Sequence, residues 1–286
     1  HRDLHSFPTR RSSDLQHSRV ILHISNWLKD YSNLSNTNGF VVGISGGIDS
    51  AVTSVLCALS GKKVVLVNMP IHQREQEYSR AKNHIENLCQ RFSNVSYCEV
   101  SLTDAFEQLR KSMPDPTSGH FLAMANTRAR LRMTTLYAIG QTEGLLVAGT
   151  GNKIEDFGIG FYTKYGDGGV DLSPIADLTK TQVFALAKEL EVIAEIRNAK
   201  PTDGLWEDGR SDEDQIGATY PELEWAMEYV NRFSGSSVNR IDPEFVPKNG
   251  LDDHQQKVLA IYIRLHNANK HKMLPIPVCE IPQELF

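Results

Sequence analysis

The sequence predicts an α/β protein with an open, mainly parallel sheet and helices on both faces. Three observations support this Rossmann-like class. Short apolar runs alternate with segments of helical period along residues 18–148, as in strands joined by crossover helices. The run Phe40–Ile44 is continuously apolar, as expected of a parallel strand buried on both faces. A glycine-rich turn follows it, and ligands bind at such carboxyl ends of strands in open sheets.

The elements can be placed one by one along the chain. Apolar residues recur at helical spacing over residues 18–31, so we predict an amphipathic helix there. Strands are predicted at 40–44, 63–67, 95–100 and 145–148, and the helices between and after them at 49–60, 75–92, 102–112 and 121–143. The alternation stops after residue 156. Beyond that point we predict helices at 177–191, 221–233 and 252–269, and a polar mobile loop at 198–215 that is either a lid or simply solvated.

The bulk composition describes a globular chain with an unusual beginning. The protein has 286 residues, of which 40% are hydrophobic and 23% charged, which suits a sizeable core. The first fifteen residues show no period and no helix cap, and their SFPTRRSSDL stretch resembles a translated sequencing adapter. We therefore expect residues 1–15 to be a non-native segment, or else a disordered basic arm. Residues 16–286 are expected to form a single domain.

Charge, hydropathy and cysteine usage exclude several classes of protein. The net charge is −5, from 30 basic and 35 acidic residues, whereas nucleic-acid binders are usually basic. The sequence contains neither an apolar run long enough to cross a bilayer nor a stretch that resembles a signal peptide. The four cysteines, Cys57, Cys89, Cys98 and Cys279, form no CxxC pair. We therefore expect a cytoplasmic protein that binds neither nucleic acid nor membrane.

The turn GISGGIDS, Gly43–Ser50, has the features of a phosphate-binding loop. Gly46 and Gly47 can adopt positive φ and let the backbone approach a ligand closely. Successive N–H groups and the start of the following helix create a concave anion site. The loop lacks the Gly-Lys-Ser/Thr ending of a Walker loop. The alternative interpretation is a tight strand–helix turn capped by Asp49 or Ser50.

Asp49 is the unexpected residue in this loop, because a carboxylate repels phosphate. Its presence is explained if it holds Mg²⁺, which would bridge the carboxylate to phosphate oxygens. Glu155 lies just past the end of a second predicted strand. By itself Glu155 is more often a surface residue or one at a helix start.

The loop and four downstream motifs resemble a known family. SGGIDS resembles the loop of ATP pyrophosphatases, the adenine nucleotide alpha hydrolase-like group, which split ATP between the α and β phosphates. Four further stretches resemble NAD synthetase, and the resemblance extends over nearly all of residues 18–280: NTRARLRM at 126–133, GTGNKIEDFGIGFYTKYGDGGVDLSPIADLTK at 149–180, KPT at 200–202 and HK at 271–272. The resemblance implies a ligase (EC 6.3.1.5) that adenylates deamido-NAD with ATP and Mg²⁺. Ammonia then displaces AMP to give NAD.

The resemblance also implies a role for individual residues. ATP would be bound by Gly43, Ile44, Ser45, Gly46, Gly47, Ile48, Asp49, Ser50, Thr150, Lys180 and Thr202. Deamido-NAD would be bound by Arg130, Lys164, Asp171, His271 and Lys272. Asp49 and Glu155 would hold the metal. Asp49 would also be catalytic, and so would Asp171, which could position ammonia or accept its proton. Without the surrounding motifs, the sequence would indicate ordinary surface residues at four of these positions: Lys164, Asp171, His271 and Lys272.

Three further expectations concern the nitrogen donor, the assembly and the rival functions. Gly151 and Asn152 stand where many ammonia-using members have Asp-His. The chain has no room for an amidase domain, so free ammonia is expected, with a separate glutaminase subunit as the alternative.

A homodimer is expected, through the first helix at Trp27, Leu28 and Tyr31 or the helix 121–143, although both could simply pack in the core. The rival functions are another amidating ATP pyrophosphatase and a non-catalytic nucleotide-binding module.

Overall fold

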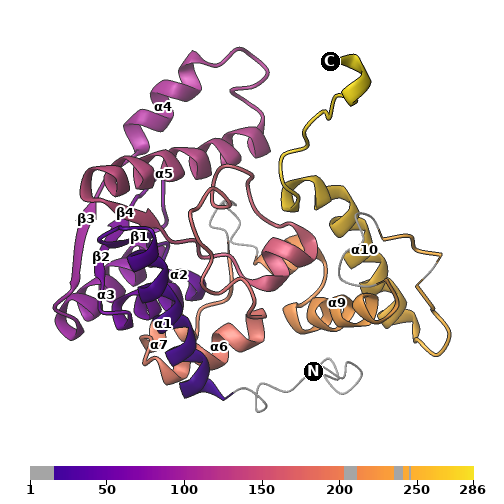
Figure 1. Ribbon diagram of the computed structural model, residues 1–286, viewed down its shortest axis with the longest axis horizontal. Helices are drawn as coiled ribbons and strands as arrows, with labels where there is room; N and C mark the ends of the chain where they lie inside the picture. Colours follow the sequence, from indigo (N-terminus) through magenta and orange to yellow (C-terminus); the bar gives the residue numbers. More distant parts are fainter. Residues whose placement is uncertain (1–15, 203–210, 235–240, 245) are drawn as a thin grey trace.

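The fold is centred on one parallel sheet, seen edge-on at the left of Figure 1. The computed structural model describes residues 16–202, 211–234, 241–244 and 246–286, so the predicted non-native segment 1–15 lies outside the described residues. Four strands, β1 (Gly39–Gly43), β2 (Lys63–Asn68), β3 (Val95–Glu99) and β4 (Leu145–Val147), pair in the order β3-β2-β1-β4. All three pairings are parallel, which confirms the predicted α/β class.

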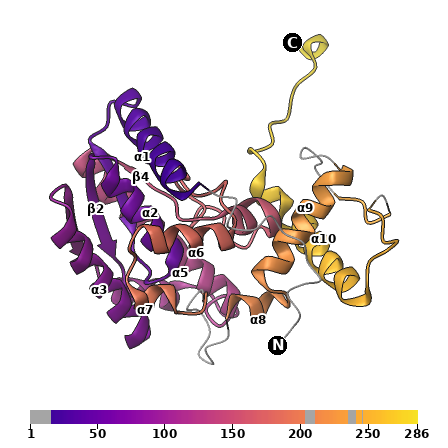
Figure 2. The same cartoon turned by 90° about the horizontal axis from the view of Figure 1, so that it is seen from below.

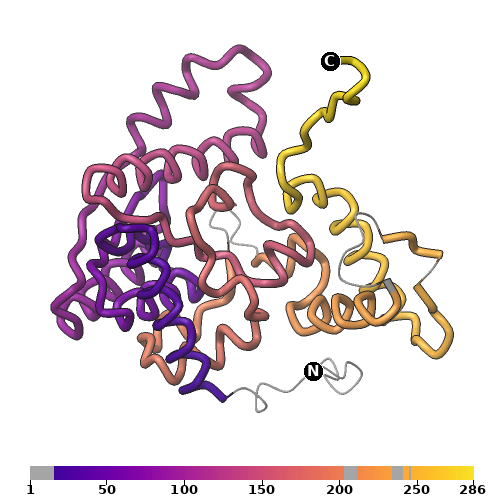
Figure 3. Tube along the Cα trace, in the orientation of Figure 1, coloured from indigo at the N-terminus to yellow at the C-terminus, as the bar shows by residue number. Residues whose placement is uncertain are grey.

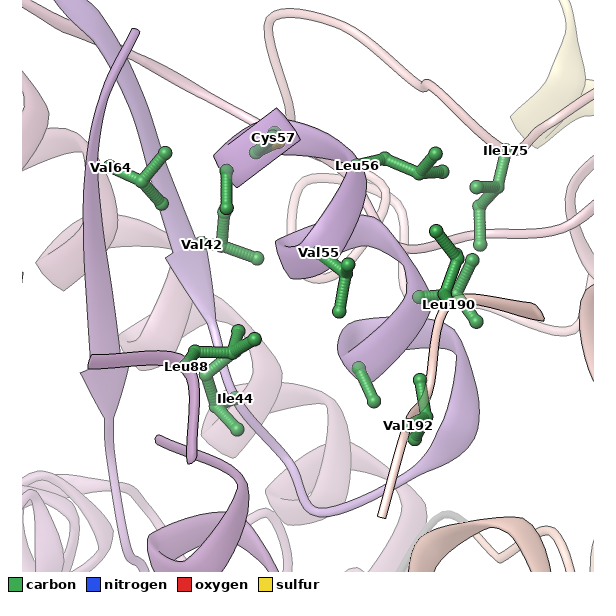
Figure 4. Close-up of a cluster of buried hydrophobic side chains, with 14 of the residues drawn as sticks. Val42, Ile44, Val55, Leu56, Cys57, Val64, Leu88, Ile175, Leu190 and Val192 are labelled. Atoms are coloured by element: carbon green, nitrogen blue, oxygen red, sulfur yellow. The ribbon is translucent and has the colours of Figure 1, made fainter. Parts of the chain in front are cut away.

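One face of the sheet is covered by helices that share a large apolar core. These helices are α1 (His17–Leu34), α2 (Ile48–Leu59), α3 (Glu75–Arg91), α6 (Lys180–Glu189) and α7 (Ala194–Arg197). Figure 4 shows Val42 and Val64 of the sheet near Leu56 and Cys57 of α2. Leu28 on α1 is fully buried in this core, so the interpretation of Leu28 as an interface residue is wrong.

The opposite face of the sheet is covered by two helices, α4 (Thr103–Ser112) and α5 (Phe121–Glu143). Phe106 of α4 and Met124 of α5 pack with Val41 and Val65 in a second apolar cluster. Gly140 lets α5 approach β4 closely, because a Cβ at this position would lie 2.9 Å from the carbonyl oxygen of Leu145. Much of α5 remains partly exposed on its outer side.

The C-terminal helices, whose course beside the sheet can be followed in Figure 3, pack around a third apolar cluster. α9 (Tyr220–Ser234) and α10 (Asp253–Met273) pack against a one-turn π-helix, η3 (Ile154–Ile159). A short 3-10 helix, η4 (Gln283–Leu285), ends the chain. Among the described helices, none combines the length and the hydropathy needed to cross a bilayer.

The observed bounds match the predicted ones within a few residues for the twelve predicted helices and strands, except where local capping intervenes. The helix predicted from 177 begins at Lys180, because Thr179 forms a capping box with Gln182. The loop predicted over 198–215 is wrong at its end, where α8 (Asp212–Ile216) begins behind a second capping box at Ser211. Residues 203–210 of that loop lie outside the described residues. Three short elements, η3, α7 and η4, were not predicted from the sequence.

Candidate active site

The turn between β1 and α2 is braced by its own two serines. The Ser50 hydroxyl donates to the carbonyl oxygen of Gly47 at 3.0 Å, and its Oγ lies 3.1 Å from Ser45 Oγ. The Gly47 N–H donates to Ser45 Oγ at 3.2 Å. Gly46 has φ of +82°, and a Cβ there would lie 2.6 Å from the Glu77 carbonyl oxygen, so glycine is required at this position. Gly47, in contrast, is extended with φ of −93°.

Gly47 is the N-cap of α2 and has no side chain with which to cap the helix. The first N–H groups of α2 therefore remain available to an anion, and the helix dipole adds favourable potential at the same place. The local structure is thus suited to phosphate. It does not match the alternative of a turn capped by Asp49 or Ser50, since Ser50 Oγ donates its proton to Gly47 rather than accepting from the helix start.

A cavity of about 540 Å³ opens beside this turn, at the carboxyl ends of the strands. Every residue predicted to bind ATP lines it: Gly43, Ile44, Ser45, Gly46, Gly47, Ile48, Asp49, Ser50, Thr150, Lys180 and Thr202. Glu155, the second predicted metal ligand, lines it too. Residues from four separate stretches of the sequence therefore meet at one cavity, as expected where parallel strands end at the same edge of a sheet.

Three charged side chains form the base of the cavity. Lys180 Nζ lies 2.5 Å from Asp49 Oδ2 and 3.0 Å from Glu155 Oε1. Only 3% of the Lys180 side chain is exposed, against 17% for Asp49 and 16% for Glu155. Burial alone lowers the pKa of Lys180, but the charges of Asp49 and Glu155 outweigh burial and raise it above its ordinary value. One ammonium group therefore stays charged between two carboxylates that come from different elements.

These two carboxylates are suited to a hard cation. Both already contact one shared cation, the Lys180 ammonium, and carboxylate oxygens are the ligands that Mg²⁺ prefers. Within the described ranges, no group of three or more His, Cys, Asp or Glu side chains is arranged to hold a metal. A magnesium site here would therefore need other oxygen ligands besides Asp49 and Glu155, and phosphate oxygens or water can supply them.

Gly151 and Asn152, which depart from the Asp-His pair, have structural roles. Asn152 Oδ1 accepts from the backbone N–H of Ile154 at 3.1 Å, and its Nδ2 donates to Asp49 Oδ1 at 3.3 Å. A Cβ at Gly151 would lie 2.2 Å from both carboxylate oxygens of Asp156. Burial first, and the charges of Glu155 and other carboxylates next, raise the pKa of Asp156 to about 8. The pair thus positions Asp49 and makes room for Asp156, which also lines the cavity.

The predicted deamido-NAD residues lie mostly beside the cavity. Of the five, only Lys272 is among the lining residues. Arg130 Nη2 donates to the Lys164 carbonyl oxygen at 3.2 Å, and Lys164 Nζ donates to the His271 carbonyl oxygen at 3.1 Å. Lys272 Nζ donates to the Gly160 carbonyl oxygen at 2.6 Å. These contacts join α5, the segment 160–168 and the end of α10 into one cationic surface.

Asp171, predicted to be both catalytic and substrate-binding, is held at the end of β4. Its Oδ2 accepts from the Val147 N–H at 2.8 Å, and its Oδ1 accepts from the Tyr137 hydroxyl at 3.0 Å. Burial and the Asp171 charge raise the pKa of Tyr137 to about 12, so the phenol remains a donor. Asp171 is exposed and is not among the residues that line the cavity.

Sequence reasoning missed several residues that line or support the cavity. Arg128 and Arg132 both line it from α5, because residues four apart share a face of a helix. Burial, and then the Arg128 charge, lower the pKa of Arg132 to about 10. The i, i+4 spacing was the available signal, whereas Arg130 lies between them on another face. Tyr220, whose hydroxyl donates to Glu155, had no comparable signal.

Comparison with known proteins agrees with this geometry. Residues 20–274 match the NAD synthase family. The chain is 39% identical to an NH(3)-dependent NAD(+) synthetase of Mesoplasma florum, over 71% of this chain and 81% of the relative. It is 40% identical to one of Methanococcoides burtonii, over 82% and 84%. The structure of an NMN synthetase from Francisella tularensis superposes with a TM-score of 0.75 at 30% identity, covering 94% of this chain and all of that one.

Proposed function

The chain belongs to the NAD synthase family, and we propose that it is a ligase that amidates deamido-NAD to NAD, consuming ATP and ammonia. The observation that carries this proposal is the base of the cavity. A phosphate-type loop stands there beside two carboxylates, Asp49 and Glu155, that share one cation. A nucleotide-binding module without catalysis would have little need for two carboxylates next to a phosphate site.

The chemistry explains the residue types. In the first step a nicotinate carboxylate oxygen attacks the α-phosphorus of ATP, the bond from that phosphorus to the bridging oxygen breaks, and pyrophosphate leaves. In the second step ammonia attacks the acyl carbon, the bond to AMP breaks, and the nitrogen loses a proton. The loop Gly43–Ser50 and the start of α2 would hold the departing pyrophosphate through backbone N–H groups. No γ-phosphate chemistry is required, which accounts for the missing Walker lysine.

Mg²⁺ is proposed as the metal, held by Asp49 and Glu155. When bound, it would neutralise the phosphate charge that accumulates on pyrophosphate. Lys180, Thr150 and Thr202 line the same cavity and are proposed to contact ATP. The position of Lys180 in the first turn of α6 is unfavourable for a cation beside a helix N-terminus, and the two carboxylates offset this cost.

Free ammonia is proposed as the nitrogen donor, in keeping with the two relatives, which are NH(3)-dependent NAD(+) synthetases. A separate glutaminase subunit stays the alternative. The role predicted for Asp171, positioning ammonia or accepting its proton, stays a prediction. Both of its carboxylate oxygens already accept hydrogen bonds, from Val147 and Tyr137.

Deamido-NAD is proposed to bind on the cationic surface formed by Arg130, Lys164, His271 and Lys272, with its nicotinate end in the cavity. Arg130 and His271 are exposed, so a second chain could complete this surface. We therefore propose a homodimer through α5, whose Phe121 and Leu122 are 42% and 58% exposed. The four free thiols fit a reducing compartment, and we propose the cytoplasm.

A second candidate function is the amidation of the corresponding mononucleotide to NMN. The observation that favours it is the similarity, at 30% identity and a TM-score of 0.75, to the NMN synthetase structure. The two functions share the same cavity and the same adenylation chemistry. They differ in whether the cationic surface beside the cavity is needed to hold the second nucleotide.

One assay separates these possibilities. Purified protein with ATP, Mg²⁺ and ammonium is supplied with deamido-NAD, with the deamido mononucleotide, or with neither, and pyrophosphate, AMP and the amide product are measured. We expect release that depends on deamido-NAD and yields NAD. Faster turnover of the mononucleotide would favour the second candidate. Release that ignores both acceptors would contradict both functions, and no release with any acceptor would favour a binding module.

A further inference from the structure

Tyr220, the first residue of α9, contacts Glu155 at the base of the cavity from the C-terminal helices. The residue is only 2% exposed. Its hydroxyl donates to Glu155 Oε1 at 2.5 Å and lies 3.3 Å from Asp212 Oδ2. A phenol has one proton to donate, and Glu155 is the nearer acceptor.

Tyr220 also contacts the cation that lies between the two carboxylates. Lys180 Nζ lies 4.8 Å from the centre of the Tyr220 ring, within the range of a cation–π contact. The same ammonium donates to Glu155 Oε1 at 3.0 Å, so this oxygen accepts from two donors on two helices, α6 and α9. The Tyr220 side chain thus contacts both Glu155, the proposed metal ligand, and Lys180, the cation that Glu155 now binds.

The position of Tyr220 is set by contacts on both sides of it. Its backbone N–H donates to Glu213 Oε1 at 2.9 Å, which ties it to α8. One helical turn later, Glu224 accepts from the Thr181 N–H at 2.9 Å and from the Thr181 hydroxyl at 2.6 Å. Because residues four apart share a helix face, α9 presents Tyr220 and Glu224 together to the start of α6. Figure 2 shows α9 beside α6 in this arrangement.

A divalent cation and the Lys180 ammonium would compete for the same two carboxylates. If the ammonium is displaced from Glu155, the Tyr220 hydroxyl is the donor that stays on Oε1. A hydrogen bond from a fixed donor orients a metal-ligating carboxylate and thereby raises metal affinity. The donor here stands on a helix of the C-terminal part of the chain, 65 residues from Glu155.

We propose that Tyr220 is a positioning residue for Glu155: it orients this carboxylate toward the divalent metal and so links the C-terminal helices to the phosphate loop. The proposal rests on the proposed function only in assigning a metal to Asp49 and Glu155. It does not depend on which acceptor is amidated.

The test measures metal binding without turnover. The full chain is mixed with Mn²⁺ and an ATP analogue that has a methylene bridge between the α and β phosphates, and binding is followed by electron paramagnetic resonance. We expect Tyr220→Phe, which removes only the hydroxyl, to raise the dissociation constant for Mn²⁺ about tenfold. Tyr229→Phe is the matched control on the same helix, because the Tyr229 hydroxyl donates to the Pro247 carbonyl oxygen, away from the cavity.

A double-mutant cycle tests the route of the effect. If Tyr220 acts through Glu155, adding Tyr220→Phe to Glu155→Gln should weaken Mn²⁺ binding little beyond Glu155→Gln alone. In turnover assays, Tyr220→Phe should raise the half-saturating Mg²⁺ concentration more than it lowers kcat, whereas a general loss of structure would lower kcat at every Mg²⁺ concentration.

The possible results distinguish the positioning role of Tyr220 from the assignment of a metal to Asp49 and Glu155. Weak binding by Glu155→Gln but wild-type binding by Tyr220→Phe would overturn the positioning role and leave the metal assignment standing. Fully additive losses in the double variant would overturn it as well. Wild-type Mn²⁺ binding by Glu155→Gln would overturn the metal assignment, and the positioning role with it. Amidation of an unexpected acceptor would contradict the proposed function alone.

Discussion

Lys180 illustrates how one residue can be buried with its charge intact. Its ammonium is accommodated because two carboxylates, Asp49 and Glu155, contact it within 3.0 Å. Removing one partner of a buried ion pair leaves an uncompensated charge and is usually costly. Here two carboxylates face one ammonium, and burial raises the pKa of Asp49. A second cation would favour the ionised form of both carboxylates.

The two carboxylates are predicted to serve turnover more than nucleotide affinity. Asp49→Asn and Glu155→Gln should each lower kcat by about 100-fold or more, because a charge that stabilises the departing phosphates is lost. ATP affinity should change far less, since the loop N–H groups remain. Pyrophosphate release and ATP binding by calorimetry measure the two quantities. Asp177→Asn is the control, because the Asp177 side chain is 96% exposed. Near wild-type turnover of both variants would rule out the metal assignment.

Gly151 is predicted to tolerate no side chain. A Cβ there would lie 2.2 Å from the Asp156 carboxylate, so Gly151→Ala must displace the Asp156 side chain. Overpacking of this kind costs about 1–3 kcal/mol of unfolding free energy, and we expect turnover to fall as well. Denaturant unfolding and the pyrophosphate assay measure both effects. Gly119→Ala is the control, since the nearest atom to its Cβ would be 4.0 Å away.

The double variant Gly151→Ala/Asp156→Ala provides a sharper form of this prediction. Truncating Asp156 removes the clash, so the stability lost in Gly151→Ala should be regained in part. Equal stability of Gly151→Ala and Gly119→Ala would show that Asp156 moves without cost, and would contradict the role assigned to Gly151.

At the scale of elements, α2 and α3 are joined by a buried polar pair. Ser54 Oγ of α2 lies 2.9 Å from His84 Nε2 of α3, and His84 is fully buried. Burial lowers the pKa of His84 from 6.5 to about 4. Between these values the unfolded chain binds a proton that the folded chain does not. The stabilising contribution of the neutral imidazole is therefore complete above pH 6.5 and is lost as the pH falls toward 4.

This contact makes a prediction about acid stability. From pH 6.5 to pH 4, the free energy of unfolding should fall by up to about 3 kcal/mol through His84 alone. His84→Gln removes the titrating group, so its stability should decline less over the same interval. Urea unfolding at a series of pH values measures the difference, with His23→Gln on the exposed side of α1 as the control. Parallel pH profiles of wild type and His84→Gln would show that the imidazole does not carry the effect.

Helix boundaries also belong to this scale, and most of them follow from the sequence. The helices α1, α2 and α3 have a marked apolar period, which residues close in sequence create, whereas α5 has almost none. The exceptions have local causes. Thr179 and Ser211 form capping boxes that set the starts of α6 and α8. The π-helix η3 depends on Asn152, whose side chain accepts from two of its N–H groups, and no apolar period announces such a turn.

At the scale of the whole molecule, the proposed homodimer can be located on one of two helices. Trp27 and Tyr31 on α1 are 39% and 36% exposed, but α1 and α5 cover opposite faces of the sheet. One two-fold contact is therefore expected to use one helix, and we propose α5 because the cationic surface adjoins it. A charged side chain that is buried in a dimer contact without a partner is strongly unfavourable, so a substitution by aspartate tests which helix forms the contact.

The corresponding prediction uses one variant on each helix. Leu122→Asp on α5 should convert the dimer to monomers at micromolar concentration, whereas Leu34→Asp on α1, where Leu34 is 86% exposed, should leave it dimeric. Sedimentation velocity measures the association state, and circular dichroism confirms folding. Dissociation by Leu34→Asp instead would move the interface to α1. A monomeric wild type would contradict the dimer itself.

The sequence by itself determined three features of this protein: the parallel strands, the phosphate loop after the first of them, and the family to which the chain belongs. These follow from local pattern, because periods, caps and glycine turns involve residues close in sequence. Every predicted ATP residue consequently lines the cavity. The tertiary structure alone decided which charges meet: Lys180 with Asp49 across 131 residues, Tyr220 with Glu155 across 65, and Arg128 and Arg132 rather than Arg130 at the cavity wall. The reason is physical, since such contacts depend on how whole helices pack on the sheet. The i, i+4 spacing of Arg128 and Arg132 places them on one helix face but does not record which face meets the cavity.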